Sequence, residues 1–287
     1  MEPTFTIARD TDNEPLVLLK AIDEHTEWQR MNMYVVIWLA TGSCNCHTGK
    51  AVYGIKAPAL LFFAPYQHYT FTSTTGFTGE RLYFHGDFYC IERHKKEVAC
   101  NGILFNNVYD PPQVLLDEEN ATAVSNYIRL LREDMRRYED ASREDMVVAH
   151  LKILLIIATR LKIKQLADAQ LLLPESTRPQ LQELHRLIET HFLTWHKPAD
   201  YAAAMFLSVK ALSRLTGKYL SKTPSELITE RIIQEAKRAL HFTNLSIKEI
   251  AAQLHFEDPY YFSRLFRKYT GVTPTEFRQK VGVILLE

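Results

Sequence analysis

The sequence predicts an α+β protein of more than one domain, with an N-terminal β domain followed by helices and a C-terminal domain that is all helical. Three observations predict this class. The 287 residues are enough for about two domains. Turn-forming residues are concentrated in residues 1–112, which hold seven of the ten glycines and six of the twelve prolines. Near the C-terminus, one helical stretch occurs twice.

The N-terminal residues contain short apolar runs, such as 34–39 and 60–64, bounded by Gly, Pro, Ser or Thr. Many short strands with frequent turns between them are typical of a small all-β barrel or sandwich. We therefore expect this part of the chain to form one.

The hydrophobic period changes in residues 113–173, which contain neither Gly nor Pro. One apolar stripe with helical spacing consists of Val124, Tyr127, Ile128, Leu131, Met135 and Tyr138. It predicts a helix over roughly 117–140, and a second helix is expected over roughly 142–170. Residues 147–157 are apolar around most of that second helix, so it has to bury more than one face. The β domain is one candidate for contact, and a second subunit is the other.

Two prolines then break the helical pattern, and we interpret residues 173–179 as a linker. The first domain comprises residues 1–172 and the second residues 180–287. Short helices are expected near 179–193, 198–206, 209–219, 247–255 and 259–269, with a long one over 224–241. Ser208 and Asp258 are natural N-caps, and Pro259 suits the first position of a helix.

The repeat lies in this second domain. Residues 212–228 align without a gap on residues 262–278, at an offset of 50, and eight of the seventeen positions are identical. In each copy a short helix, a tight turn and another short helix follow one another. This is the outline of a helix-turn-helix, whose second helix enters the DNA major groove.

The charges on the two second helices support a DNA partner. Lys210, Arg214 and Lys218 lie four residues apart on one face, and no acidic residue occurs between Ser208 and Tyr219. In the second copy, Arg264, Arg267 and Lys268 form a matching basic cluster on the second helix. The opposite faces carry the apolar residues Leu212, Leu215, Tyr219, Phe262, Leu265, Phe266 and Tyr269. Although the chain is formally neutral, residues 179–287 hold fifteen Lys and Arg against eleven Asp and Glu.

Residues 246–278 closely resemble the second helix-turn-helix motif of the AraC/XylS transcriptional regulators, and the resemblance covers about 100 C-terminal residues. Two departures stand out. His255 replaces a usual glycine, which predicts a strained or altered turn. The pair Thr216-Gly217 stands where Phe-Lys is common, and Gly217 inside a helix costs about 1 kcal/mol relative to alanine.

The resemblance implies a sequence-specific regulator of transcription, an activator and not an enzyme, whose two recognition helices enter successive major grooves of double-stranded DNA. Two sets of residues are expected to face bases, one in each groove: Lys210, Ser213 and Arg214, and Pro259, Tyr260, Ser263 and Arg264. Phosphates are expected to contact Lys218, Arg267 and Lys268. Phosphate contacts set register and affinity but carry no sequence information.

The N-terminal half is similar to the cupin-like sensor domain of that family, on the residues 58–65, Gln67, His68, 79–85, Phe88 and 102–105. This similarity implies a β-barrel that binds a small-molecule effector in its interior. It also implies that the helices after the barrel form a homodimer and that RNA polymerase is a further partner. Candidate ligand-binding residues, with core packing as the other interpretation, are Trp38, Tyr53, His68, Tyr83 and His85.

Other functions need chemistry that the sequence supplies only in part. Cys44, Cys46 and His47 are soft metal ligands, yet they lack the spacing of a zinc pair and the His-x-His followed by Glu of metal-binding cupins. We expect no metal and no cofactor. A metal-dependent cupin enzyme with a DNA-binding tail stays open as an alternative, as does an alkyl-transfer repair regulator using Cys44, Cys46, Cys90 and Cys100.

The N-terminal residues show no signal-peptide pattern, and no apolar stretch approaches the ~20 residues that cross a bilayer. We therefore expect a cytoplasmic protein with no membrane partner.

Overall fold

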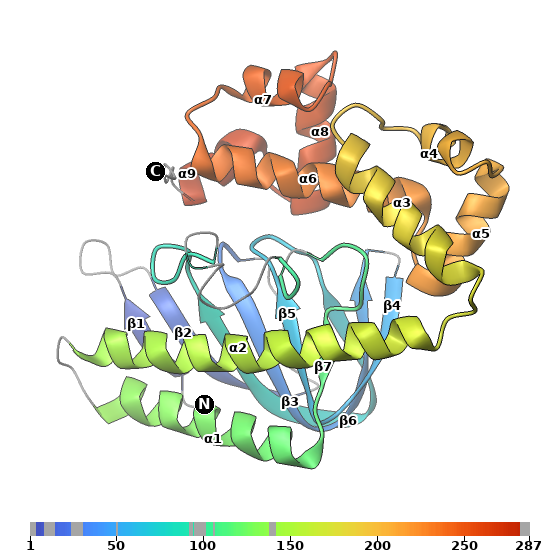
Figure 1. Cartoon of the computed structure of the whole chain (residues 1–287). Helices are drawn as coiled ribbons and strands as arrows, with labels where there is room; N and C mark the ends of the chain where they lie inside the picture. Colours follow the sequence, from blue (N-terminus) through green and yellow to red (C-terminus); the bar gives the residue numbers. More distant parts are fainter. Residues whose placement is uncertain are drawn as a thin grey trace. The chain divides into compact units, whose positions relative to one another are not determined.

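The computed structural model describes residues 4–8, 15–23, 31–49, 51–91, 94, 102–105, 107–137 and 142–281. Predictions for Tyr138 and Cys100 lie outside these residues. The described chain combines a β-sheet in the N-terminal part with a helical C-terminal part, so the α+β class is confirmed (Figure 1).

The sheet is antiparallel and has the strand order β1-β2-β6-β3-β5-β7, with β4 paired to β3. Its strands are β1 (Thr4–Ala8), β2 (Pro15–Asp23), β3 (Tyr34–Thr48), β4 (Ala51–Lys56), β5 (Ala59–Phe63), β6 (Thr70–Phe84) and β7 (Gln113–Leu115). The central pair, β3 and β6, has 15 residues in each strand. Its register shifts near Gly42, whose φ of 83° belongs to the left-handed region that favours glycine.

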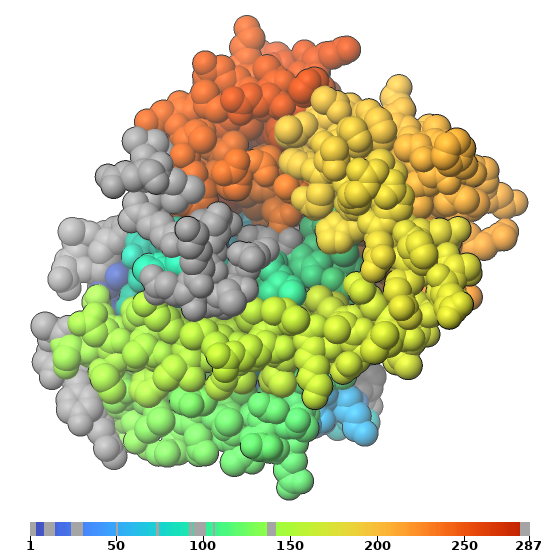
Figure 2. Space-filling model, viewed as in Figure 1, coloured from blue at the N-terminus to red at the C-terminus, as the bar shows by residue number. Residues whose placement is uncertain are grey.

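Side chains alternate between two buried faces of this sheet, as the pleat requires. One face packs against α1 (Glu118–Arg137) and α2 (Ser142–Leu171), and this cluster includes Trp38 and Phe62. Figure 2 shows the outer surfaces of these helices as one continuous layer. The other face, which includes Ile37 and Leu61, forms a second apolar cluster. The predicted β domain and both helices are present, whereas the likeness to a cupin stays a prediction.

The buried residues of helix α2 lie on one stripe with helical spacing, so within this chain the helix buries one face, and the prediction that it buries more than one is wrong. Among them is a lysine: Lys162 is only 5% exposed, and its Nζ donates to the carbonyl oxygens of Pro111 at 2.6 Å and Gln113 at 2.9 Å. The same helix leaves Met146, Ile153 and Ile163 exposed.

Up to residue 281, where the described chain ends, the C-terminal part contains the helices α3 (Thr177–His191), α4 (Pro198–Ala204), α5 (Val209–Leu220), α6 (Pro224–Phe242), α7 (Ile247–Gln253), α8 (Pro259–Thr270) and α9 (Pro274–Val281). Each predicted helix of the second domain is therefore found close to its expected place. The long helix α6 contacts α4, α5, α7, α8 and α9, so it forms the centre of this part.

Two compact units divide the chain. The first comprises residues 1–107 and 111–168, and the second comprises Val108–Asp110 together with residues 169–287. The second unit thus contains three residues from the connection between β6 and β7, besides the end of α2. Among the helices of the described residues, none has the length and apolarity that a membrane crossing needs.

Candidate nucleic-acid interface

The helix pairs α4–α5 and α7–α8 each have helix-turn-helix geometry. Both first helices end in the same turn, in which Phe206 and His255 adopt the left-handed conformation with φ of 55°. The next amide closes the turn onto the first helix. In the first pair, Leu207 N–H donates to the Ala202 carbonyl at 2.8 Å, and in the second pair, Phe256 N–H donates to the Ala251 carbonyl at 2.9 Å. The predicted departure at His255 therefore coincides with a backbone conformation that favours glycine.

The second helix of each pair begins at its predicted cap. The Ser208 hydroxyl accepts a hydrogen bond from the Ala211 amide at 3.1 Å, and an Asp258 carboxylate oxygen accepts one from the Tyr260 amide at 2.8 Å. Pro259 occupies the first turn of α8. These caps fix where the two helices start, and hence which residues face outward from them.

Both second helices bury the apolar face that the sequence predicts. Leu212 and Thr216 of α5 are fully buried, as are Phe262 and Phe266 of α8. The ring of Phe266 packs edge-on against Phe277 of α9, with 5.4 Å between the centroids. Because one face is fixed in the core, the opposite face is held toward solvent.

That outward face carries the predicted DNA-binding residues. The structure leaves exposed Lys210, Ser213, Arg214, Lys218, Tyr260, Arg264, Arg267 and Lys268, while Pro259 and Ser263 are half-buried. The Ser263 hydroxyl donates to the Pro259 carbonyl at 2.9 Å. Two exposed basic surfaces at equivalent places of a repeat therefore stand on rigid helices.

The electrostatics of these surfaces suit an anionic partner. The Arg264 side chain is 71% exposed, and its guanidinium lies 3.8 Å from the Asp258 carboxylate, a distance at which a solvated pair is weak. Lys218 Nζ lies 4.9 Å from the centre of the Tyr219 ring. Exposed guanidinium and ammonium groups in such positions bind phosphates and the edges of bases.

The candidate ligand-binding residues of the N-terminal unit are not gathered at one place. Trp38 lies on the sheet face that packs against the helices, whereas Tyr53 and Tyr83 belong to the cluster on the other face. His68 is exposed. The His85 ring makes hydrogen bonds to Asn32 at 2.8 Å and to the backbone amide of Asp87 at 3.1 Å. Their role in ligand binding stays a prediction.

A buried cation that the sequence did not predict lies beside Tyr83. Arg81 is 5% exposed on β6, and its guanidinium lies 4.8 Å from the centre of the Tyr83 ring. Burial raises the pKa of Tyr69, and the nearby Arg81 opposes that shift. The alternation of β6 could have placed Arg81 on the face of Tyr83, but nothing local shows that this face is buried.

The cysteines of the described residues do not resemble a metal site. Cys44, Cys46 and Cys90 are free and buried. Burial raises the pKa of the Cys44 thiol to about 11, and it raises that of Cys46 further, which disfavours the thiolate that metals and alkyl transfer require. In the part of the chain that the structure describes, no three His, Cys, Asp or Glu side chains come together to hold a metal.

Comparison with known proteins bears on the C-terminal unit. Residues 201–280 match the family model described as a helix-turn-helix domain. The chain is 30% identical over 110 residues to the HTH-type transcriptional regulator YisR of Bacillus subtilis, a match that covers 38% of each chain. It is 28% identical to the transcriptional activator RhaS of Escherichia fergusonii, over 66% of this chain and 73% of RhaS.

Other matches are partial or weak. The alignments with the first curated relatives span about a third of the length of those proteins. Among solved structures, an apo point variant of ToxT from Vibrio cholerae is 16% identical with a TM-score of 0.41, covering 94% of this chain and 99% of that one. A ToxT structure with a bound unsaturated fatty acid is 17% identical with a TM-score of 0.40, covering 94% and 98%.

Proposed function

Because residues 201–280 match a helix-turn-helix domain model and the chain is similar to the transcriptional activator RhaS, we propose that it is an AraC-type regulator that binds double-stranded DNA sequence-specifically and thereby regulates transcription. The observation that carries this proposal is the duplicated basic face. Arg214 of α5 and Arg264 of α8 are both exposed at equivalent positions of the repeat. The relatives are regulators of transcription, which supports a role without catalysis.

In this function the two recognition helices read one face of the duplex. The bases of one major groove contact Lys210, Ser213 and Arg214, and those of the next contact Pro259, Tyr260, Ser263 and Arg264. Phosphates contact Lys218, Arg267 and Lys268. An arginine that donates two hydrogen bonds to a guanine discriminates between bases, whereas a phosphate contact adds affinity for every sequence.

The N-terminal unit supplies control in this proposal. A small-molecule effector binds the β domain, and the helices α1 and α2 form a homodimer that carries four recognition helices. Supporting the dimer, α2 leaves Met146, Ile153 and Ile163 exposed. We place the protein in the cytoplasm as an activator that contacts RNA polymerase, in line with the name of the activator RhaS.

The test is selection of DNA by the purified full chain from a random duplex library. We expect an enriched sequence with two conserved blocks about one helical turn apart. The double variant Arg214→Ala/Arg264→Ala should enrich none, while a control variant on α1, Arg129→Ala, should enrich the same sequence as the unmodified chain. If the unmodified chain enriches no sequence, the proposed function is wrong.

A further inference from the structure

Three residues from the middle of the N-terminal region are part of the DNA-binding unit. Val108–Asp110 belong to the second unit, although the chain on both sides, up to 107 and from 111, belongs to the first. We call residues 108–110 the strap. Val108 is 8% exposed, and Tyr109 and Asp110 are half-buried.

One anchor of the strap lies at the corner where recognition helix α5 meets α6. Lys222, between these helices, is 8% exposed, and its Nζ donates to the Val108 carbonyl at 2.7 Å. The same Nζ forms an ion pair with Glu230 of α6 at 2.7 Å. A buried ammonium depends on such partners because desolvation of its charge is costly. The strap therefore contributes one of the groups that hold this corner.

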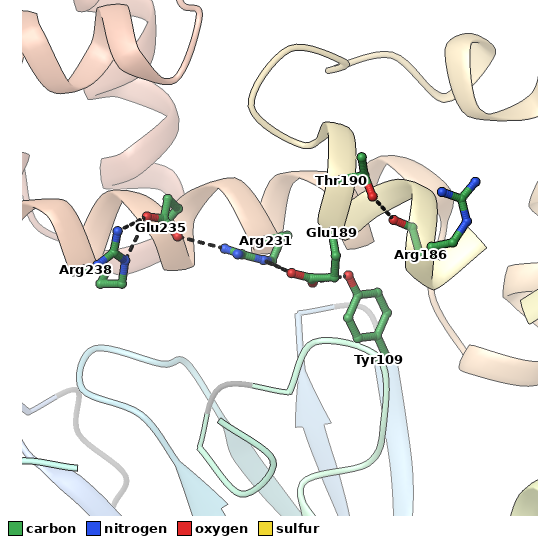
Figure 3. Close-up of polar contacts among 7 residues, drawn as sticks. All are labelled: Tyr109, Arg186, Glu189, Thr190, Arg231, Glu235 and Arg238. Carbon is green, nitrogen blue, oxygen red and sulfur yellow. Dashed lines mark hydrogen bonds and ion pairs between the residues drawn. The ribbon is translucent and has the colours of Figure 1, made fainter. Parts of the chain in front are cut away.

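The other anchor joins the strap to α3 and α6 (Figure 3). The Tyr109 hydroxyl donates to the Glu189 carboxylate of α3 at 2.7 Å, and Arg231 of α6 contacts the same carboxylate at 3.0 and 3.1 Å. Burial and the adjacent Glu189 raise the pKa of Tyr109, so its hydroxyl stays a donor. The Tyr109 ring packs on that of His185, with 4.0 Å between the centroids.

The chain immediately after the strap is held just as firmly, but within the first unit. The Pro111 and Gln113 carbonyls accept hydrogen bonds from the buried Lys162 of α2. The Val108 and Pro111 carbonyls are three positions apart in the chain, and three extended residues span at most about 11 Å. The two carbonyls therefore cannot separate further than this unless one of the anchors releases its carbonyl.

We propose that the strap is a regulatory coupling device: its docking on Lys222 and Glu189 fixes recognition helix α5, and movement within the first unit controls that docking through Lys162. The inference rests on the proposed function, because it specifies how the N-terminal unit acts on DNA binding. Neither anchor lies on the second helix pair, since Lys222 precedes α6 and Glu189 belongs to α3. The strap therefore sets the state of the first pair.

Docking favours DNA binding. The strap contacts α3 through Glu189 and the turn between α5 and α6 through Lys222, whereas the groove-facing residues Lys210, Arg214 and Lys218 stay exposed while it is docked. It therefore does not block the duplex. The docked strap orders the corner that supports α5. The apparent affinity for DNA is proportional to the fraction of molecules in which α5 is binding-competent, so loss of docking lowers that affinity.

The experiment compares the full chain with Tyr109→Phe, Tyr109→Ala and the matched control Tyr127→Phe on α1. Amide hydrogen exchange is measured first, without DNA. The Tyr109 hydrogen bond to a carboxylate corresponds to about tenfold in the docking equilibrium. We expect faster exchange in residues 218–226 of both Tyr109 variants, larger in Tyr109→Ala, with unchanged exchange in 259–270 and an unchanged control.

Binding is measured next, on the duplex that the unmodified chain selects. Both Tyr109 variants should bind more weakly, up to about tenfold for Tyr109→Ala, and should lose hydroxyl-radical protection in the α5 half of the site only. Unchanged exchange in 218–226, or equal loss of protection in both halves, overturns the inference. A faster exchange in 218–226 with no DNA selected by the unmodified chain supports the coupling and instead rejects the proposed function.

As a second disruption, Lys222→Met/Glu230→Gln removes the buried ammonium and its half-buried carboxylate partner together, so neither charge is left unpaired. It should reproduce the loss in the α5 half. Retention of full protection there overturns the role of the Lys222 anchor.

Discussion

The two helix-turn-helix pairs have the same pattern of residues but different local support. Helix α7 begins with a complete capping box, in which Ser246 and Glu249 satisfy each other's backbone amides. Helix α4 begins at Lys197, whose side chain makes no cap. The second recognition helix ends at Gly271, which adopts the left-handed conformation without strain, whereas α5 ends at Ser221 in that conformation.

This difference shows which pair depends on contacts from outside itself. The first pair has a weaker cap, a glycine at position 217 inside its recognition helix and a corner held by the buried Lys222 and the strap. The second pair is stabilised by residues of its own sequence, namely the capping box of α7 and Gly271 at the end of α8. Within the proposed function, we therefore assign anchoring on DNA to the second pair and the response to the N-terminal unit to the first.

The largest expected effects are on stability. Phe262→Ala should lower the free energy of unfolding by about 3–5 kcal/mol, because a fully buried ring leaves a cavity. Leu212→Ala, at the equivalent place in α5, should fall toward the low end of about 2–5 kcal/mol, since the less rigid pair relaxes around the cavity. Urea titration followed by circular dichroism measures both. A larger loss for Leu212→Ala would reverse the comparison.

Next in size is the loss of base contacts. Arg264→Ala should weaken binding by about 1–3 kcal/mol and relax preference at one base pair, as expected for an arginine that pairs with guanine. Arg214→Ala should do the same at a base pair in the other groove. The measurement is the affinity of each protein variant for duplexes in which single base pairs of the selected sequence are changed. A uniform loss across all variants would instead assign these arginines to phosphates.

The left-handed turn residues give a gain in stability. Phe206 is 97% exposed with φ of 55°, so Phe206→Gly removes strain without loss of packing. We expect a gain of about 1 kcal/mol. His255→Gly should gain less, because the His255 ring makes a 3.2 Å hydrogen bond to the Gln253 carbonyl. Thermal unfolding compares the two, and destabilisation by Phe206→Gly would show that the phenyl ring has a contact.

The caps test the difference between the pairs directly. Ser246→Ala should cost about 1 kcal/mol by removing the capping box of α7. Lys197→Ser should stabilise α4 by somewhat less than that, because it supplies the missing acceptor. Equal, negligible changes in unfolding free energy for both variants would mean that the caps do not distinguish the pairs.

The smallest effect is expected at a phosphate contact. Lys268→Ala should weaken all sequences alike and reduce the slope of log affinity against log salt by about one. Salt titrations with the selected duplex and an unrelated duplex provide the measurement. An unchanged slope would remove Lys268 from the interface.

The C-terminal unit was predictable because its signals are local. Helical period, the caps Ser208 and Asp258 and the repeat all act within a few residues, and together they set which face of each recognition helix is exposed. The strap was not predictable. Tyr109 and Lys222 are far apart in sequence, and no pattern marks a tyrosine that will meet Glu189, 80 residues further along the chain.

The N-terminal unit shows why candidate residues could not be grouped from sequence alone. Alternation along β3 and β6 separates two faces, but it does not say which face the helices will cover. Trp38 and Tyr83 therefore lie in different clusters. The buried Arg81 and Lys162 were likewise missed, because long cationic side chains are seldom buried and their partners come from distant elements.

If two equivalent helices bind adjacent major grooves of one duplex, a hydroxyl-radical footprint of the full chain on its selected duplex will show both. We expect two protected segments on one side of the DNA, about 34 Å apart, with Arg214→Ala removing one and Arg264→Ala removing the other. A single protected segment, or one that both substitutions weaken equally, would mean that the two helices do not bind separate grooves.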